Sequence, residues 1–274
     1  MSKSAGLRVV RAPNPSPMTL DGTRTFLVGR ERPAVIDPGP ADERHLAAIL
    51  STLGEARPAA ILLTHAHPDH AALAPQLARA TGAVVMMGRG ALDPSLDPAG
   101  VDRWLEEGEE IKTDAGPLRV LATPGHVPEH LAFLWRGGEA PPAGALFVGD
   151  LLMGEGDTTL VAPPEGDLAA YLHTLERIGE LSPGVLYPAH GPALADPAAA
   201  VARFLAHRRE RIEQVTRALR AVGVATPAEL VESVYGAALH PELRAAAEGS
   251  IRAILRYLDE EGRVRHAGEG RYGT

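Results

Sequence analysis

The sequence predicts a mixed α/β (α+β) protein that ends in a helical module. Two observations support this prediction. Across residues 1–200, short apolar runs alternate with Ala- and Leu-rich stretches of helical periodicity. After Pro197 the short apolar runs give way to Arg- and Glu-rich helical stretches. At 274 residues the chain has room for one large domain and a smaller one. We therefore expect two parts, residues 1–200 and residues 201–274.

The first part contains strands and helices in alternation. The apolar run Ala60–Leu63 is typical of a strand buried on both faces. A helix that starts near Asp42 is followed by Gly54, and both residue types are common at helix ends. The expected strands are Thr25–Val28, Ala34–Ile36, Ala60–Leu63, Val84–Met87, Leu118–Ala122, Leu131–Trp135, Leu146–Val148 and Val185–Tyr187. The expected helices are Asp42–Leu53, Ala71–Ala80 and Leu168–Gly179.

The second part has the element order of a winged helix. Thr226 and Glu229 form a capping-box pattern at the start of a helix, with Pro227 at its first position. Residues 1–200 hold 15 basic and 25 acidic side chains, a net charge of −10, whereas residues 201–274 hold 12 and 10, a net charge of +2. This difference supports a separate module. The expected elements are the helices Ala198–Ala221, Thr226–Tyr235 and Pro241–Glu261, and a hairpin over Val264–Tyr272.

Composition excludes several kinds of site. The chain has no cysteine, so it forms no disulfide, thiolate zinc site or iron–sulfur cluster. Any metal ion must be bound by Asp, Glu or the 11 His. The net charge of −8 gives no general attraction to nucleic acid or to an anionic membrane. No apolar run approaches the roughly 18 residues of a membrane span, and the N-terminus lacks the pattern of a signal peptide. We expect a cytoplasmic protein without a membrane partner.

The segment Thr64–His70 concentrates metal-binding side chains. It follows an expected buried strand and leads into an expected helix. In an extended chain His65 and His67 point to the same side, so they can share one metal ion. Asp69 and His70 stand at the helix start and can face a second ion. A histidine-rich surface loop is the structural alternative, but three imidazoles and a carboxylate so close together disfavour it.

Three further candidate ligands each follow an expected strand. Small residues precede each of them, as in Thr-Pro-Gly-His, Gly-Asp and Pro-Ala-His. Glycine and proline let the backbone turn sharply at a strand end. A Gly-Asp pair alone is a common turn, but it gains weight as one of four such strand ends. These candidates are His126, Asp150 and His190.

Taken together, these blocks resemble the metallo-β-lactamase superfamily. Its His-x-His-x-Asp-His motif and the three later blocks occur in the same order across about residues 7–200. The segments Asn14–Gly29, Gly149–Gly156 and His207–Arg211 further resemble the β-lactamase-like protein 2 group, whose members end in a winged-helix-like module. The resemblance implies an αββα sandwich over residues 1–200, followed by a long helix and a winged-helix-like module over residues 201–274.

The resemblance also implies a dinuclear metal site like that of the glyoxalase II and nuclease branches. The implied ligands are His65, His67 and His126 for one ion, Asp69, His70 and His190 for the other, and Asp150 as a bridge. The implied cofactors are two zinc ions, and iron or manganese also suits such ligands. A hydroxide that bridges the metals would be the nucleophile. Asp150 and Asp69 are the expected catalytic residues, one orienting the nucleophile and the other acting as acid or base.

Three functions fit these features. Hydrolysis of a small ester, thioester or lactone is favoured by the acidic first part and by the low aromatic content of 4%. Cleavage of single-stranded RNA is favoured by the group resemblance and by Arg252, Arg256, Arg263 and Arg265 in the basic second part. A nucleic-acid-binding regulator with a vestigial metal site is the third function, and the complete ligand set disfavours it. The winged-helix-like end could instead form a homodimer.

Other polar residues have supporting roles in this interpretation. Asp37, at a strand end, is the best candidate for fixing a ligand imidazole. We expect His130 to support the site without binding metal. We expect His45, in an amphipathic helix, at the surface. His207 and Arg208 of the long helix could reach a substrate or could pack against the first part.

Overall fold

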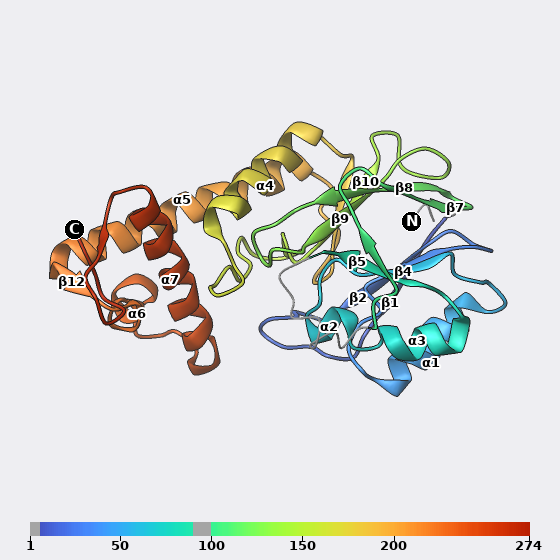
Figure 1. The fold of residues 1–274 in the computed structure, drawn as a ribbon, viewed down its shortest axis with the longest axis horizontal. Coiled ribbons are helices and arrows are strands. Elements are labelled where there is room, and N and C mark those ends of the chain that lie inside the picture. Colours follow the sequence, from blue (N-terminus) through green and yellow to red (C-terminus); the bar gives the residue numbers. More distant parts are fainter. Residues whose placement is uncertain (1–5, 90–99) are drawn as a thin grey trace.

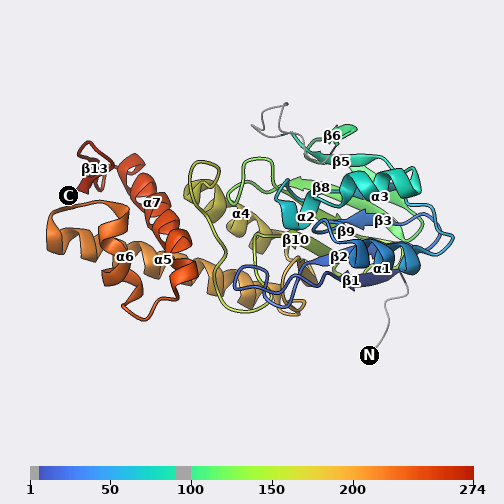
Figure 2. The same ribbon diagram turned by 90° about the horizontal axis from the view of Figure 1, so that it is seen from below.

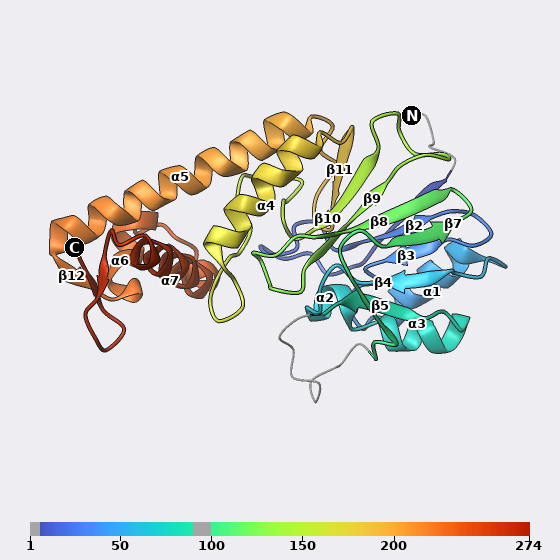
Figure 3. The same cartoon turned by 45° about the horizontal axis from the view of Figure 1, so that its top comes forward.

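A computed structural model of the chain describes residues 6–89 and 100–274. The larger part is a sandwich of two β-sheets, and a helical module lies at the other end of the molecule (Figure 1). The long helix α5 (Pro197–Val222) runs from the sandwich to this module (Figure 3). The candidate metal ligands all belong to the sandwich.

The first sheet has six strands that follow one another in sequence order. The first three strands pair antiparallel, and the pairs from β3 onward are parallel. All four strands expected in this region are present, and β1 and β6 are additional. The strands are β1 (Leu7–Arg11), β2 (Arg24–Val28), β3 (Ala34–Ile36), β4 (Ala60–Leu62), β5 (Val85–Gly88) and β6 (Arg103–Leu105), with β5 one residue later than expected.

The second sheet has the strand order β11-β10-β9-β8-β7. Its neighbours are antiparallel except β10 and β11, which are parallel and have α4 (Leu168–Leu181) in their connection. The four expected strands are present, and β7 adds a hairpin partner for β8. The strands are β7 (Glu110–Thr113), β8 (Gly116–Ala122), β9 (Leu131–Trp135), β10 (Ala145–Gly149) and β11 (Val185–Pro188).

Three apolar layers define the sandwich. Between the sheets, Ile36 and Leu62 of the first sheet lie in one buried cluster with Phe133 and Phe147 of the second. Alternate strand side chains point to the outer faces. There α1 (Glu43–Leu53) and α3 (Ala74–Thr81) cover the first sheet (Figure 2). Residues of α4 and α5 pack on the second sheet. The expected αββα layering is confirmed.

The C-terminal module contains the expected helices and hairpin. The capping box of Thr226 and Glu229 is present at the start of α6. Ile251 and Leu255 of the last helix share one buried apolar cluster with Tyr171 of α4, so this cluster continues from the sandwich into the module. The elements are β12 (Val224–Ala225), α6 (Pro227–Tyr235), a 3₁₀ turn (Pro241–Leu243), α7 (Arg244–Glu260), β13 (Arg265–His266) and β14 (Tyr272–Gly273).

Two expectations about helices are corrected. The expected helix Ala71–Ala80 starts three residues later, as α3, and a separate short helix α2 (Pro68–Ala71) precedes it, because Pro75 lacks the N–H that would continue the first helix. His45 is buried instead of exposed, and its Nε2 lies 2.9 Å from Thr25 Oγ1, since that side of α1 packs on the first sheet. Within residues 6–89 and 100–274, no helix combines the length and apolarity needed to cross a membrane.

Candidate metal centre

The structure brings all seven predicted ligands to one end of the two sheets. They come from the loop and short helix after β4 and from the turns after β8, β10 and β11. They form two groups, and within each group the potential ligand atoms lie within 4.8 Å of one another. The first group is His65, His67, His126 and Asp150, and the second is Asp69, His70 and His190.

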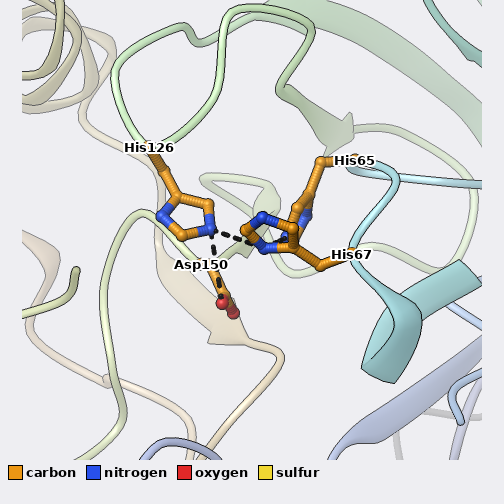
Figure 4. A group of neighbouring side chains, drawn as sticks. All are labelled: His65, His67, His126 and Asp150. Atoms are coloured by element: carbon orange, nitrogen blue, oxygen red, sulfur yellow. Dashed lines mark hydrogen bonds and ion pairs between the residues drawn. The ribbon is translucent and has the colours of Figure 1, made fainter. Parts of the chain in front are cut away.

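In the first group three imidazoles point toward one another (Figure 4). His67 Nδ1 lies 2.9 Å from His65 Nε2 and 3.1 Å from His126 Nε2. With metal–nitrogen distances of about 2.0–2.1 Å, nitrogens that share a tetrahedral zinc ion lie roughly 3.3 Å apart. The three nitrogens are therefore close to the spacing that a metal ion requires.

Asp150 lies between the two groups and faces both. Its Oδ1 is 3.3 Å from His70 Nε2 and 3.2 Å from His190 Nε2. Its Oδ2 lies 3.8 Å from His126 Nε2 in the first group. In the second group, Asp69 Oδ2 is 3.3 Å from His190 Nε2. The two oxygens of Asp150 thus have different neighbours, as a bridging carboxylate needs.

Several polar atoms around Asp150 have no hydrogen-bond partner. Among the described residues, these buried atoms include His70 Nε2, His190 Nε2 and Asp150 Oδ1. Buried polar groups are normally hydrogen-bonded, so each exception needs an explanation. Because these three atoms converge, one cation would satisfy all of them. The donor set of imidazoles and carboxylates fits a divalent metal ion.

Asp37 fixes the orientation of two ligand rings, as the sequence indicated. Its carboxylate accepts hydrogen bonds from Thr64 N (2.8 Å), Thr64 Oγ1 (2.8 Å) and His70 Nδ1 (3.0 Å). Because the Thr64 hydroxyl donates to Asp37, it accepts from His65 Nδ1 at 3.0 Å. Both His65 and His70 therefore carry their proton on Nδ1 and present Nε2 to the site.

His130 supports the turn that carries Asp150, also as expected. Its Nδ1 lies 2.8 Å from Thr123 Oγ1, and its Nε2 accepts from the backbone N–H of Asp150 at 3.4 Å. Both ring nitrogens are thus in use. Gly149 precedes this turn with φ of 50°, and a Cβ there would lie 2.7 Å from both His130 Nε2 and Thr64 Oγ1. Only glycine fits this position.

The electrostatics leave His65 and Asp150 in metal-binding form and keep His70 and His190 protonated. Burial holds the pKa of His65 well below its usual value, so its ring is neutral. Burial tends to raise the pKa of Asp150, but the neighbouring His70 and His190 outweigh it and hold that pKa well below its usual value. Burial tends to lower the pKa of His190, but its hydrogen bonds with Asp150 and Asp69 outweigh burial and raise that pKa to about 9. Burial also opposes a charge on His70, but Asp150 and Asp37 outweigh it and raise the pKa of His70 well above its usual value. A neutral imidazole and an ionised carboxylate are the states that bind a cation, so a bound cation would displace a proton from each of these two rings.

The cluster opens into a cavity of about 380 Å³. His67, Asp69, His126 and Asp150 line one side of it, and residues of α5, α6 and α7 line the other. The two residues of the long helix that could reach a substrate or pack against the first part behave differently. His207 lines the cavity, whereas Arg208 is buried, donates to the Thr159 carbonyl and lies 5.0 Å from the Tyr171 ring.

Two residues near the site were not predicted from the sequence. Glu165 Oε2 lies 3.6 Å from His67 Nε2, the nitrogen of that ring that faces away from the other imidazoles. Arg211 lines the cavity together with His207. His207 and Arg211 are four residues apart and therefore lie on one face of a helix, and this spacing was visible in the sequence. Glu165 lies in an irregular loop and left no comparable pattern.

Comparison with protein families gives two matches that together cover most of the chain. A profile described as the metallo-beta-lactamase superfamily matches residues 18–190. A profile described as the beta-lactamase associated winged helix domain matches residues 226–272. These matches agree with the sandwich and with the C-terminal module.

Two relatives and one solved structure match nearly the whole chain, and a further structure matches about three-quarters of it. A beta-lactamase-like protein 2 homolog of Caenorhabditis elegans is 29% identical over 266 residues, covering 92% of this chain and 83% of the relative. An atrochrysone carboxyl ACP thioesterase of Passalora fulva is 30% identical over 267 residues, covering 92% and 74%. A metallo-beta-lactamase family protein from Thermus thermophilus superposes with a TM-score of 0.81 at 25% identity, covering 98% of each chain. The protein TTHA1623, solved in a di-iron-bound form, gives a TM-score of 0.55 at 30% identity, covering 72% and 98%.

Proposed function

Because the chain belongs to the metallo-beta-lactamase superfamily and is a hydrolase of that fold, we propose that it hydrolyses a small ester or thioester at a dinuclear metal centre. The observation that carries this proposal is the position of Asp150, with one oxygen toward each ligand group. We also propose that residues 1–200 form the catalytic part and that residues 201–274 complete its substrate cavity.

The two ligand groups define the proposed metal sites. His65, His67 and His126 would hold one ion, Asp69, His70 and His190 the other, and Asp150 both. Zinc is the metal we favour for this imidazole-rich set. The di-iron form of TTHA1623 makes iron the first alternative, with manganese as a further one. Two bound cations would acidify a water molecule and polarise the bond that it attacks.

The chain's own carboxylates have separate tasks in this proposal. Asp150, with a side chain 13% exposed, is held between imidazoles of both groups and orients the attacking water. Asp69 has a side chain 30% exposed and lines the cavity. It can therefore move a proton between the site and the leaving group. Asp37 is buried behind His70 and acts by orienting that ring.

The surroundings of the cavity favour a small substrate over RNA. Two of the arginines that suggested RNA binding pair on the surface with glutamates, Arg252 with Glu248 at 2.6 Å and Arg256 with Glu260 at 2.9 Å. Neither arginine is among the described residues that line the cavity. Single-stranded nucleic acid is normally held by a cationic groove with aromatic side chains. The thioesterase relative supports an acyl substrate.

Metal analysis combined with a substrate panel tests this function. We expect two metal ions per chain and hydrolysis of an acetyl or longer acyl thioester. Asp150→Ala should lose at least about a hundredfold in kcat/KM because it removes a shared ligand. Glu176→Ala, an exposed carboxylate on α4, is the control and should retain activity. One ion per chain, or full activity in Asp150→Ala, would contradict the dinuclear mechanism.

The panel also separates the substrate classes. It contains thioesters, a lactone, bis-p-nitrophenyl phosphate and single-stranded RNA. Hydrolysis of RNA without hydrolysis of any acyl substrate would replace the ester and thioester assignment with a nuclease. No turnover of any member by the metal-loaded protein would favour a binding role instead.

A further inference from the structure

The side of the cavity opposite the metal ligands is built by the C-terminal module. The contributing residues come from the end of α6, the segment that follows it and the first turns of α7. All but one of them are apolar or aromatic. These residues, here called the apolar wall, are Tyr235, Leu239, Leu243, Ala246, Ala247 and Ser250.

The sandwich extends this surface toward the metal ligands. Met153 and Leu160 line the cavity beside His126 and Asp150. Leu160 is also fixed to the site, because its carbonyl accepts from His126 Nδ1 at 2.6 Å. Apolar side chains therefore line the cavity on the sandwich side as well as at the apolar wall.

Arg211 holds the apolar wall in place. Its Nη1 donates to the Val234 carbonyl at 2.9 Å and to Gln214 Oε1 at 2.6 Å. Its guanidinium lies 4.2 Å from the centre of the Tyr235 ring, within cation–π distance. These contacts fasten the end of α6 to α5, so Tyr235 and the segment after it have a fixed position at the cavity.

We infer that the apolar wall binds the acyl chain of the substrate, so that the substrate class is an ester or thioester of a medium-length, apolar carboxylic acid. This inference rests on the proposed function. It places the substrate carbonyl at the ligand cluster and the hydrocarbon chain against α6 and α7. Each CH₂ that leaves water here contributes a factor of about four in affinity. The phosphate groups of an RNA backbone would gain no affinity from such an apolar surface.

A substitution that narrows the cavity tests the inference. Ala246 lines the cavity, whereas its neighbour Ala245 is exposed and is not part of the lining. Octanoate should bind the metal-loaded wild type at least about tenfold more tightly than acetate, as measured by calorimetry. Ala246→Leu should remove this preference, and Ala245→Leu, the same change one residue earlier, should keep it.

Hydrolysis gives a second readout. The ratio of kcat/KM for an octanoyl thioester to that for an acetyl thioester should exceed about ten in the wild type and in Ala245→Leu, and should fall at least about tenfold in Ala246→Leu. A second variant, Leu243→Asp, places a charge in the apolar wall and should lower the same ratio, with Arg244→Asp, one residue later and outside the lining, as its control.

The outcomes distinguish this inference from the proposed function. Equal affinity for octanoate and acetate, or an unchanged preference in both Ala246→Leu and Leu243→Asp, would overturn the apolar acyl site. Octanoate binding that depends on Ala246, without turnover of any ester or thioester, would leave the site standing and overturn the proposed hydrolysis. Cleavage of RNA without octanoate binding would overturn both.

Discussion

At the scale of single residues, the site depends on which ring nitrogen of each histidine carries the proton. Hydrogen bonds to residues distant in the sequence determine this. Imidazoles bind a metal ion only through an unprotonated nitrogen, so the tautomer of each ring matters. Asp37 sets the tautomer of His70 directly and that of His65 through the Thr64 hydroxyl. One buried carboxylate thus prepares one ligand for each proposed metal ion.

Replacement of Asp37 should weaken both metal sites. In Asp37→Ala, His70 and Thr64 lose their acceptor, and we expect metal affinity to fall by about 10–100-fold. Titration of the apo protein with zinc in competition with a chelator measures this loss. The control is Asp21→Ala, since Asp21 pairs with Arg11 and Arg24 at the surface. Equal zinc affinity in both variants would mean that Asp37 has no role in ligand orientation.

The ligands themselves could be predicted from the sequence, but their supports only in part. Imidazole and carboxylate side chains clustered at strand ends have few uses other than metal binding, so His65 to His70 stood out. Asp37 was recognisable because it also follows a strand. The contact of Glu165 with His67 joins a loop to the site across about a hundred residues, and no periodic pattern marks such a contact.

At the scale of elements, the inner strands of both sheets and the edge strand β11 were predictable, whereas the edge strands β1, β6 and β7 were not. The strands β6 and β7 carry charged side chains such as Arg103 and Glu110, which mask the alternation of buried and exposed positions.

The turn after β7 links the second sheet to the first through hydrogen bonds. The carboxylate of Asp114, after β7, accepts from the backbone N–H groups of Arg30, Glu31 and Arg32 between β2 and β3.

This connection should make stability depend on pH. Burial tends to raise the pKa of Asp114, but the backbone N–H groups of Glu31, Arg30 and Arg32 outweigh it and lower that pKa. A carboxyl group with a lowered folded-state pKa stabilises the protein above its unfolded-state pKa, and this contribution is lost as the pH falls through the folded-state pKa. Asp114→Asn should therefore lower the melting temperature at neutral pH. In thermal unfolding at a series of pH values, the difference in melting temperature between variant and wild type should shrink as the pH falls. A difference that stays constant with pH would contradict this account.

At the scale of the whole molecule, the sandwich and the C-terminal module share one apolar core. Leu255 and Leu258 of α7 belong to the same buried cluster as Tyr171 of α4 and Phe204 of α5. The charge difference along the chain suggested a separate module, but charge reports only the surface. The long helix α5 joins the two parts (Figure 1). Residues of both parts line the cavity.

A shared core predicts that both parts unfold together. Trp104 and Trp135 both lie in the sandwich, so tryptophan fluorescence follows that part, whereas far-UV circular dichroism also follows the helices of the module. We expect the two signals to give one coincident transition. Leu255→Ala, which leaves a cavity in the shared cluster, should lower the free energy of unfolding by about 2–5 kcal/mol and shift both signals equally. The exposed Arg252→Ala is the control and should change stability by less than about 0.5 kcal/mol. If Leu255→Ala moved only the dichroism signal and left the fluorescence transition in place, the module would be an independent folding unit, and the apolar wall could move relative to the metal ligands.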